Sequence, residues 1–151
     1  PEGEEDRKLA WDPAWPVFSV NLFDAVAYAA WRSGREGIQY RLLHDEEYEK
    51  AARGVDGRVY SFGDDYDGSY SHTNVSAPGR MTPMPVGSFP GDESPWGIRD
   101  LSGGIQTWCW DAGPGPFRAF CLVRGGAWAT SPKRNPCAAR CSAGSPTTRP
   151  P

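Results

Sequence analysis

The sequence lacks the features that direct a protein into a membrane or onto nucleic acid. Its 151 residues contain no apolar run near the length of a membrane span. The formal net charge of −3 leaves no basic excess that would attract phosphate groups. We therefore expect no membrane span and no nucleic-acid partner.

The chain also opens without a methionine and without a signal-peptide pattern. We expect that an N-terminal part is missing, so the sequence leaves the localisation open between the cytoplasm and export through that part. Residues 1–10 are strongly charged, and we predict a linker or a disordered segment there. Residues 11–151 are predicted to form one domain.

Histidines and long regular elements are scarce as well. The two histidines, His44 and His72, are expected to be solvated loop residues rather than metal ligands. The 18 glycines and 15 prolines interrupt helices and strands, whereas the 7 tryptophans supply large areas to bury. This composition predicts an irregular, loop-rich domain held together by aromatic clusters.

Helical patterns occur in two places. The first follows Asn21, which can cap a helix, and Gly34 is predicted to end it. The second begins at His44 or Asp45, places its acidic residues first and its basic residues last, and ends at Gly54. Strand-like patterns occur at Trp15–Val20, Tyr40–Leu43, Val59–Phe62, Met84–Phe89, Ile105–Trp110 and Phe120–Trp128.

The composition changes after Trp128. Residues 129–151 contain no valine, isoleucine, leucine, methionine or aromatic residue. Such a segment cannot supply a hydrophobic core, so we expect it to lie over a surface that the rest of the chain builds.

Several sequence blocks together resemble one family. In chain order they are WPVFSVNLFDAVAYAAW, YRLLHDEEYEKAARG, GRVYSFGD, PVGSFPGDESPWGIRDLSGGIQTWCWD and VRGGAW, which span Trp15–Trp128. They resemble the formylglycine-generating-enzyme-like (sulfatase-modifying-factor) family, a branch of the C-type lectin fold. The resemblance implies an α+β fold, in which two helices pack on a small twisted antiparallel sheet with long loops. It also implies that Gly125 and Gly126 let backbones approach closely.

The resemblance raises the question whether this chain has the cysteines that bind copper in the family's enzymes. The family's enzymes hold copper between two thiolates, and soft sulfur ligands suit Cu(I). Counted from Arg124, those two positions fall on Asn135 and Arg140, whereas Cys137 and Cys141 are out of register. We therefore expect no catalytic residues and no copper, with a copper-dependent formylglycine-generating oxidase as the alternative.

Calcium is a separate question. Asp64, Asp65 and Asp67 form either a solvated turn or a carboxylate site that calcium would favour. The family's calcium-related box has lost its amide and carboxylate oxygens here, because Gly104 and Thr107 stand in place of Asn and Glu. We expect no cofactor, and calcium stays the open alternative.

The remaining interpretation is a binding protein. In relatives that retroelements diversify, the C-terminal part of this fold is rewritten at template adenines. Within residues 129–151 only Lys133 has no codon ending in a pyrimidine, the pattern that such rewriting leaves. The resemblance thus implies a non-catalytic, receptor-type protein of a bacterium or phage with a hypervariable surface at about residues 105–151.

Its ligand would be an unknown protein or another macromolecule. Affinity would come from a few exposed anchors. The alternative binding role is a sensor domain attached to a bacterial serine/threonine kinase. The predicted ligand-binding residues are Gln106, Thr107, Trp110, Phe117, Arg118, Phe120, Thr130, Ser131, Lys133, Arg134, Asn135, Cys137 and Ser142.

Overall fold

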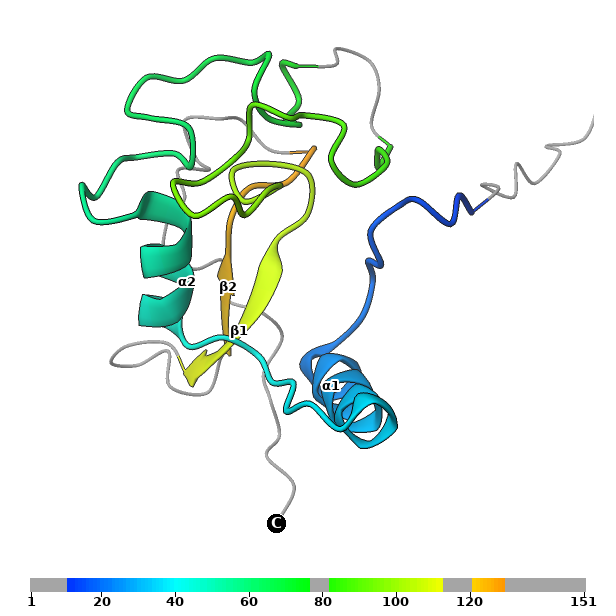
Figure 1. The fold of residues 1–151 in the computed structure, drawn as a ribbon. Helices are drawn as coiled ribbons and strands as arrows, with labels where there is room; N and C mark the ends of the chain where they lie inside the picture. Colours follow the sequence, from blue (N-terminus) through cyan, green and yellow to red (C-terminus); the bar gives the residue numbers. More distant parts are fainter. Residues whose placement is uncertain (1–10, 77–81, 113–120, 130–151) are drawn as a thin grey trace, which may run out of the picture.

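The computed structural model describes residues 11–76, 82–112 and 121–129 (Figure 1). The described elements are α1 (Leu22–Glu36), α2 (Asp45–Arg53), β1 (Thr107–Ala112) and β2 (Cys121–Arg124). A long stretch of loops joins α2 to β1, and α2 packs against both strands. In Figure 1, α1 lies on the other side of the strands from α2. The predicted α+β class with two helices, an antiparallel sheet and long loops is confirmed.

Helix α1 begins at the predicted cap. The side chain of Asn21 accepts a hydrogen bond from the Asp24 backbone N–H at 3.0 Å, and the Asp24 carboxylate accepts one from the Asn21 N–H at 3.0 Å. The predicted end at Gly34 is wrong, because the helix continues to Glu36 and ends at Gly37. Glycine inside a helix only weakens it, whereas the left-handed backbone of Gly37, with φ at 68°, ends it.

Helix α2 follows the sequence expectation closely. The Glu47 carboxylate accepts a hydrogen bond from the His44 backbone N–H at 2.8 Å, which satisfies one of the donors at the start of the helix. The helix ends before Gly54, as predicted, and buries Tyr48 and Ala52.

The two strands form an antiparallel pair with Thr107 opposite Arg124. Both lie within or near their predicted ranges, although β1 begins later than Ile105. The other strand-like segments are not strands in the described part of the chain, where Tyr60 makes only an isolated bridge to Gly63. Several of their apolar side chains are exposed, among them those of Val17, Leu43 and Val86.

The core lies between α2 and the strands. Its buried cluster is Tyr48, Ala52, Leu101, Cys109 and Leu122. The Tyr48 hydroxyl donates to the Leu101 carbonyl at 2.9 Å, so α2 is tied to the loop that precedes β1.

Glycines allow this packing, as predicted. A Cβ on Gly125 would lie 2.8 Å from the Leu101 carbonyl oxygen, and a Cβ on Gly126 would overlap the Ser102 carbonyl oxygen. Residues with side chains would therefore push the end of β2 away from the Leu101–Ser102 backbone.

Candidate ligand-binding cleft

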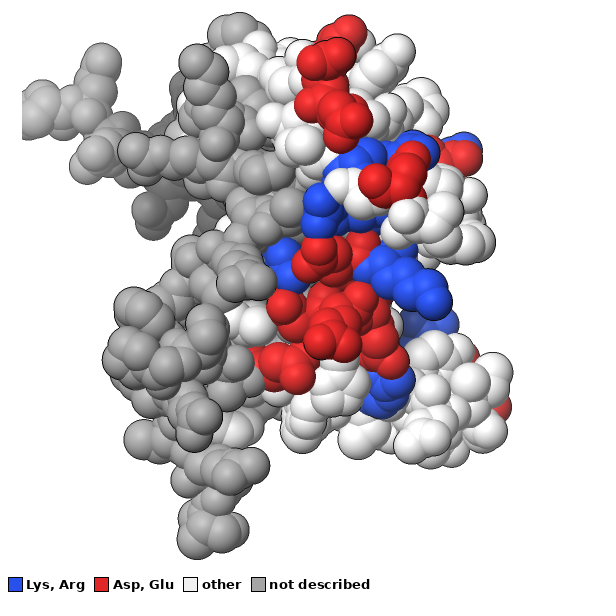
Figure 2. All heavy atoms as spheres, turned by 90° about the vertical axis from the view of Figure 1, so that its left-hand side faces the viewer, with Lys and Arg blue, Asp and Glu red and all other residues white. Residues whose placement is uncertain are grey.

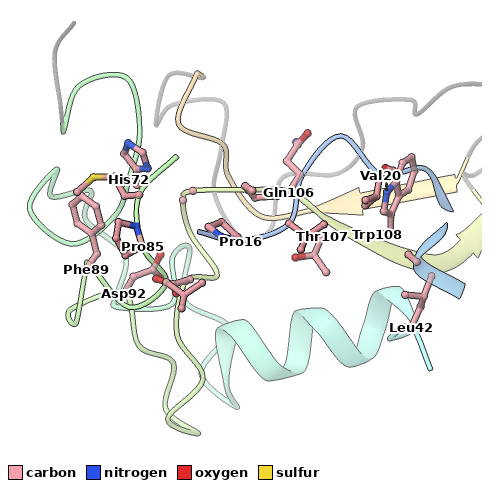
Figure 3. Close-up of a pocket in the computed structure, with 18 residues that line it drawn as sticks. Pro16, Val20, Leu42, His72, Pro85, Phe89, Asp92, Gln106, Thr107 and Trp108 are labelled. Atoms are coloured by element: carbon pink, nitrogen blue, oxygen red, sulfur yellow. Dashed lines mark hydrogen bonds between the residues drawn. The ribbon is translucent and has the colours of Figure 1, made fainter. Parts of the chain in front are cut away.

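A cleft of about 330 Å³ opens where several loops meet (Figure 3). Most of its lining comes from the chain before α1, the loop at residues 84–89 with Asp92 and Asp100, and the turn that leads into β1, and His72 and Leu42 complete it together with Ala25 of α1. A cavity of this size suits a small ligand or one side chain of a larger partner.

The turn into β1 is held tightly against the His72 loop. The Gly104 N–H donates to the His72 carbonyl at 2.8 Å, and the Trp128 N–H donates to the Gly104 carbonyl at 2.9 Å. A Cβ on Gly103 would lie 2.6 Å from the His72 backbone nitrogen, so only glycine fits there. This wall of the cleft is therefore built by backbone contacts.

The expectation that His72 is solvated is wrong. The residue is 5% exposed, and its ring stacks against Phe89 at 5.6 Å and against Trp128 at 6.4 Å between ring centroids. The row continues to Phe18, whose ring meets Trp128 edge-on at 5.6 Å. Sequence reasoning missed this because the partners come from four distant loops.

Asp92 is a buried carboxylate at one end of the cleft (Figure 3). It accepts hydrogen bonds from the Ser61 hydroxyl and from the Ser102 backbone N–H, the latter at 2.9 Å. Burial raises the pKa of Asp92, the hydrogen bonds from Ser61 and Ser102 oppose that change, and the negative charge of Asp100 adds to it. No local pattern marks this network, because Ser61 is far from Asp92 in the sequence.

Asp100 lies beside Asp92 and also lines the cleft. Its backbone is in the left-handed region with φ at 60°, which asparagine and aspartate tolerate better than most residues. Its N–H donates to the Asp92 carbonyl at 3.0 Å, and its Oδ2 accepts from the Gly87 N–H at 2.7 Å. Sequence reasoning did not select it.

The predicted binding residues are placed as follows. Gln106 and Thr107 line the cleft, where they lie between its two ends (Figure 3). Trp110 is 54% exposed on β1, donates its backbone N–H to the Leu43 carbonyl at 2.9 Å and does not line the cleft. The others lie outside the described residues and stay predictions: Phe117, Arg118, Phe120, Thr130, Ser131, Lys133, Arg134, Asn135, Cys137 and Ser142.

The surface over α2 carries both acidic and basic side chains (Figure 2). Arg124, 1% exposed on β2, pairs with Asp45 and with Glu49, the latter at 3.0 Å. Arg41 pairs with Glu47 at 2.7 Å. This face therefore joins α2 to its neighbours.

The described residues offer little to a metal ion. Within residues 11–76, 82–112 and 121–129, no three His, Cys, Asp or Glu side chains gather in an arrangement that could hold one. Asp64 and Asp67 accept hydrogen bonds from the nearby backbone N–H groups of Val59 and Ser69.

The copper expectation turns on residues that the structure does not describe. Asn135 and Arg140 both lie outside the described residues, and neither side chain carries a thiolate that could bind Cu(I). The donor set at these positions therefore does not fit copper. No helix in the described part of the chain is long and apolar enough to cross a membrane.

Two helices, a small antiparallel sheet and long loops that enclose a cleft define a C-type lectin-like fold of the formylglycine-generating-enzyme type. The chain belongs to the family described as the sulfatase-modifying factor enzyme 1-like domain, whose model matches residues 1–150.

Curated relatives include an enzyme and an inactive protein. The formylglycine-generating enzyme of Mycobacterium tuberculosis is 33% identical over 114 residues, which cover 68% of this chain and 36% of that enzyme. The inactive C-alpha-formylglycine-generating enzyme 2 of Bos taurus is 30% identical over 123 residues, 76% of this chain and 38% of the relative. The chain thus spans little more than a third of the length of either relative.

Two solved structures have a similar fold. PvdO from Pseudomonas aeruginosa superposes with a TM-score of 0.77 and 26% identity, over 89% of this chain and 59% of PvdO. The Treponema denticola variable protein 1 superposes with a TM-score of 0.54 and 26% identity, over 67% of this chain and 41% of that protein.

Proposed function

We propose that this protein is a non-catalytic, receptor-type ligand-binding member of its family, whose surface at about residues 105–151 is diversified by a retroelement. The observation that carries the proposal is the register of the cysteines, since Asn135 and Arg140 stand where the family's copper thiolates belong. An inactive relative and a structurally similar variable protein support it.

The arrangement of β1 also supports the proposal. Cys109 is fully buried in the core, whereas its neighbour Trp110 is exposed. Side chains alternate between the two faces of a strand, so the outer positions can be replaced without disturbing the core. Such a strand can carry variable ligand contacts on a constant scaffold.

An activity assay tests the non-catalytic part. The purified protein is incubated with Cu(I), oxygen and a cysteine peptide of the sulfatase type, and conversion to formylglycine is measured by mass spectrometry. We expect no conversion, while the Mycobacterium tuberculosis enzyme in the same buffer converts the peptide and shows that the assay works. Conversion by this protein, or tight Cu(I) binding that Cys137→Ser abolishes, would contradict the proposal and support the oxidase.

The DNA around the gene tests the diversification. We expect a near-copy of the DNA that encodes the C-terminal segment, close to a reverse-transcriptase gene, with mismatches confined to adenines of the copy. If no such repeat exists, the retroelement part of the proposal is wrong.

A further inference from the structure

The cleft has a charge distribution that suits one kind of ligand. Two carboxylates, Asp92 and Asp100, line it, and none of its described lining residues is a lysine or an arginine. Most of the remaining lining is aliphatic or aromatic. A ligand that complements this cleft combines an apolar body with a positive charge.

The acidic group and the apolar wall lie at opposite ends of the cleft. Asp92 lies near His72 and Phe89 at one end, and Val20, Leu42 and Trp108 lie at the other (Figure 3). The Trp108 ring is held in place, because its N–H donates to the Val20 carbonyl at 3.1 Å. An elongated ligand would therefore place its charged group at the Asp92 end and its apolar chain along the wall towards Trp108.

Asp100 is the carboxylate that has room for a ligand. Asp92 is 1% exposed and its oxygens already accept hydrogen bonds from Ser61 and Ser102. Asp100 is half-buried, and only its Oδ2 accepts a hydrogen bond, from Gly87. Among the described residues its Oδ1 has no hydrogen-bond or ion-pair partner, so this oxygen can accept from a ligand.

This geometry selects the type of cation. A guanidinium group gains most from a carboxylate that offers both oxygens side by side. Here Oδ2 of Asp100 already accepts from the Gly87 N–H, which leaves Oδ1 as the oxygen that has no hydrogen bond among the described residues. A compact ammonium group needs only such a point contact, and the Phe89 ring at the same end of the cleft also favours a nearby cation.

We propose that the cleft binds a primary alkylammonium group, with the ammonium at Asp100 and the alkyl chain along the wall that ends at Trp108. The proposal rests on the ligand-binding function proposed above and names the ligand class of the cleft. The group can belong to a free alkylamine or to a lysine side chain of a protein ligand, since both present the same chemistry.

The test compares n-hexylammonium with 1-hexanol, which has the same chain without the charge, by NMR titration of the full chain. We expect hexylammonium to bind about tenfold more tightly at low salt, and the difference to shrink at high salt because the charge interaction is screened. Equal binding of the two probes, or tighter binding of hexanol, would overturn the proposal.

Asp100→Asn provides the matched variant. Asparagine keeps an acceptor for the Gly87 N–H and tolerates the left-handed backbone, so the fold should persist while the charge is lost. We expect hexylammonium affinity to drop to that of hexanol. Asp64→Asn is the control, because Asp64 also accepts from a backbone N–H, that of Val59, but does not line the cleft. Unchanged hexylammonium affinity in Asp100→Asn would contradict the proposal, and the two-probe comparison decides by itself if this variant does not fold.

A second arm separates the two sources. An end-blocked peptide with one central lysine is compared with the same peptide carrying norleucine. Binding that requires the lysine supports a protein ligand, and hexylammonium binding without lysine-peptide binding supports a free amine. The two proposals can fail separately. If neither hexylammonium nor the lysine peptide binds, and the activity assay with the sulfatase-type peptide still shows no formylglycine, the alkylammonium proposal is wrong and the non-catalytic function stands.

Discussion

At the residue scale, three glycines allow close backbone contacts around the loop that precedes β1. Gly103 lies against the His72 backbone, and Gly125 and Gly126 lie against the Leu101 and Ser102 carbonyls. Each site lacks the space for a single Cβ, and backbone atoms cannot turn aside as a flexible side chain can. These glycines therefore set both the core and one wall of the cleft.

Gly126→Ala should destabilise the protein strongly. The added Cβ overlaps the Ser102 carbonyl, so we expect the free energy of unfolding to fall by about 2–4 kcal/mol. Gly34→Ala is the matched control, because nothing lies within 4 Å of a Cβ there and alanine suits a helix interior. It should raise the stability by about 0.5–1 kcal/mol. Urea denaturation of both variants checks this, and similar effects in the two would contradict the packing described.

At the element scale, α2 is the helix that joins the parts of the fold. It contributes Tyr48 and Ala52 to the core, and its acidic residues meet Arg124 from β2. Arg124 is buried, so removing it would leave Asp45 without its ion-pair partner on β2 and would leave Glu49 with Arg53 alone. The helix is short, and it depends on these tertiary contacts more than on its own propensity.

The pH dependence of stability should reveal the charges of α2. The hydrogen bonds from Arg41 and then from the His44 N–H lower the pKa of Glu47 from its ordinary value of 4.5 to about 2. A lowered pKa in the folded state stabilises the protein above the ordinary value, and the effect is lost as the pH falls towards the folded value. We expect the free energy of unfolding to decrease from about pH 5 to about pH 2.

Glu47→Gln should flatten that decrease when unfolding is measured across the same pH range. Glu46→Gln is the control, because the Glu46 carboxylate has no hydrogen-bond or ion-pair partner among the described residues. If both variants keep the slope of the original protein, the ion pair with Arg41 does not contribute to folding.

At the scale of the whole molecule, residues that the scaffold needs are distinct from surface residues that can be replaced. Trp128 lies in the aromatic row with Phe18 and His72, and its backbone holds the turn at Gly104. Trp110 lies on β1 and exposes more than half of its surface. The fold thus needs Trp128 and leaves Trp110 available to a ligand.

Alanine at the two tryptophans should give different outcomes. We expect Trp128→Ala to lower the free energy of unfolding by about 2–4 kcal/mol, because it opens the aromatic row. Trp110→Ala should change it by less than about 0.5 kcal/mol. Thermal and urea unfolding measure both, and equal losses would contradict the separation of scaffold and surface.

Local signals explain which elements could be predicted. The Asn21 cap, the acidic start of α2 and its stop at Gly54 depend on residues within one or two turns of each other, and all three are confirmed. The strand predictions at Trp15–Val20 and Met84–Phe89 were wrong. A strand also needs a neighbouring strand to pair with, and the local sequence pattern does not indicate whether one is present. The expected solvation of His72 failed for a similar reason.

The sequence by itself determined the family and the two helices, because the family motifs and the helix caps are each contained in short stretches of the chain. Only the tertiary structure decided the cleft and its acidic end. The network of Asp92 joins Ser61 and Ser102, which are 41 positions apart in the chain, and Asp100 reaches Gly87 across 13 positions. Such groups meet because the backbone packs tightly at Gly103 and Gly126, and no local pattern carries that information.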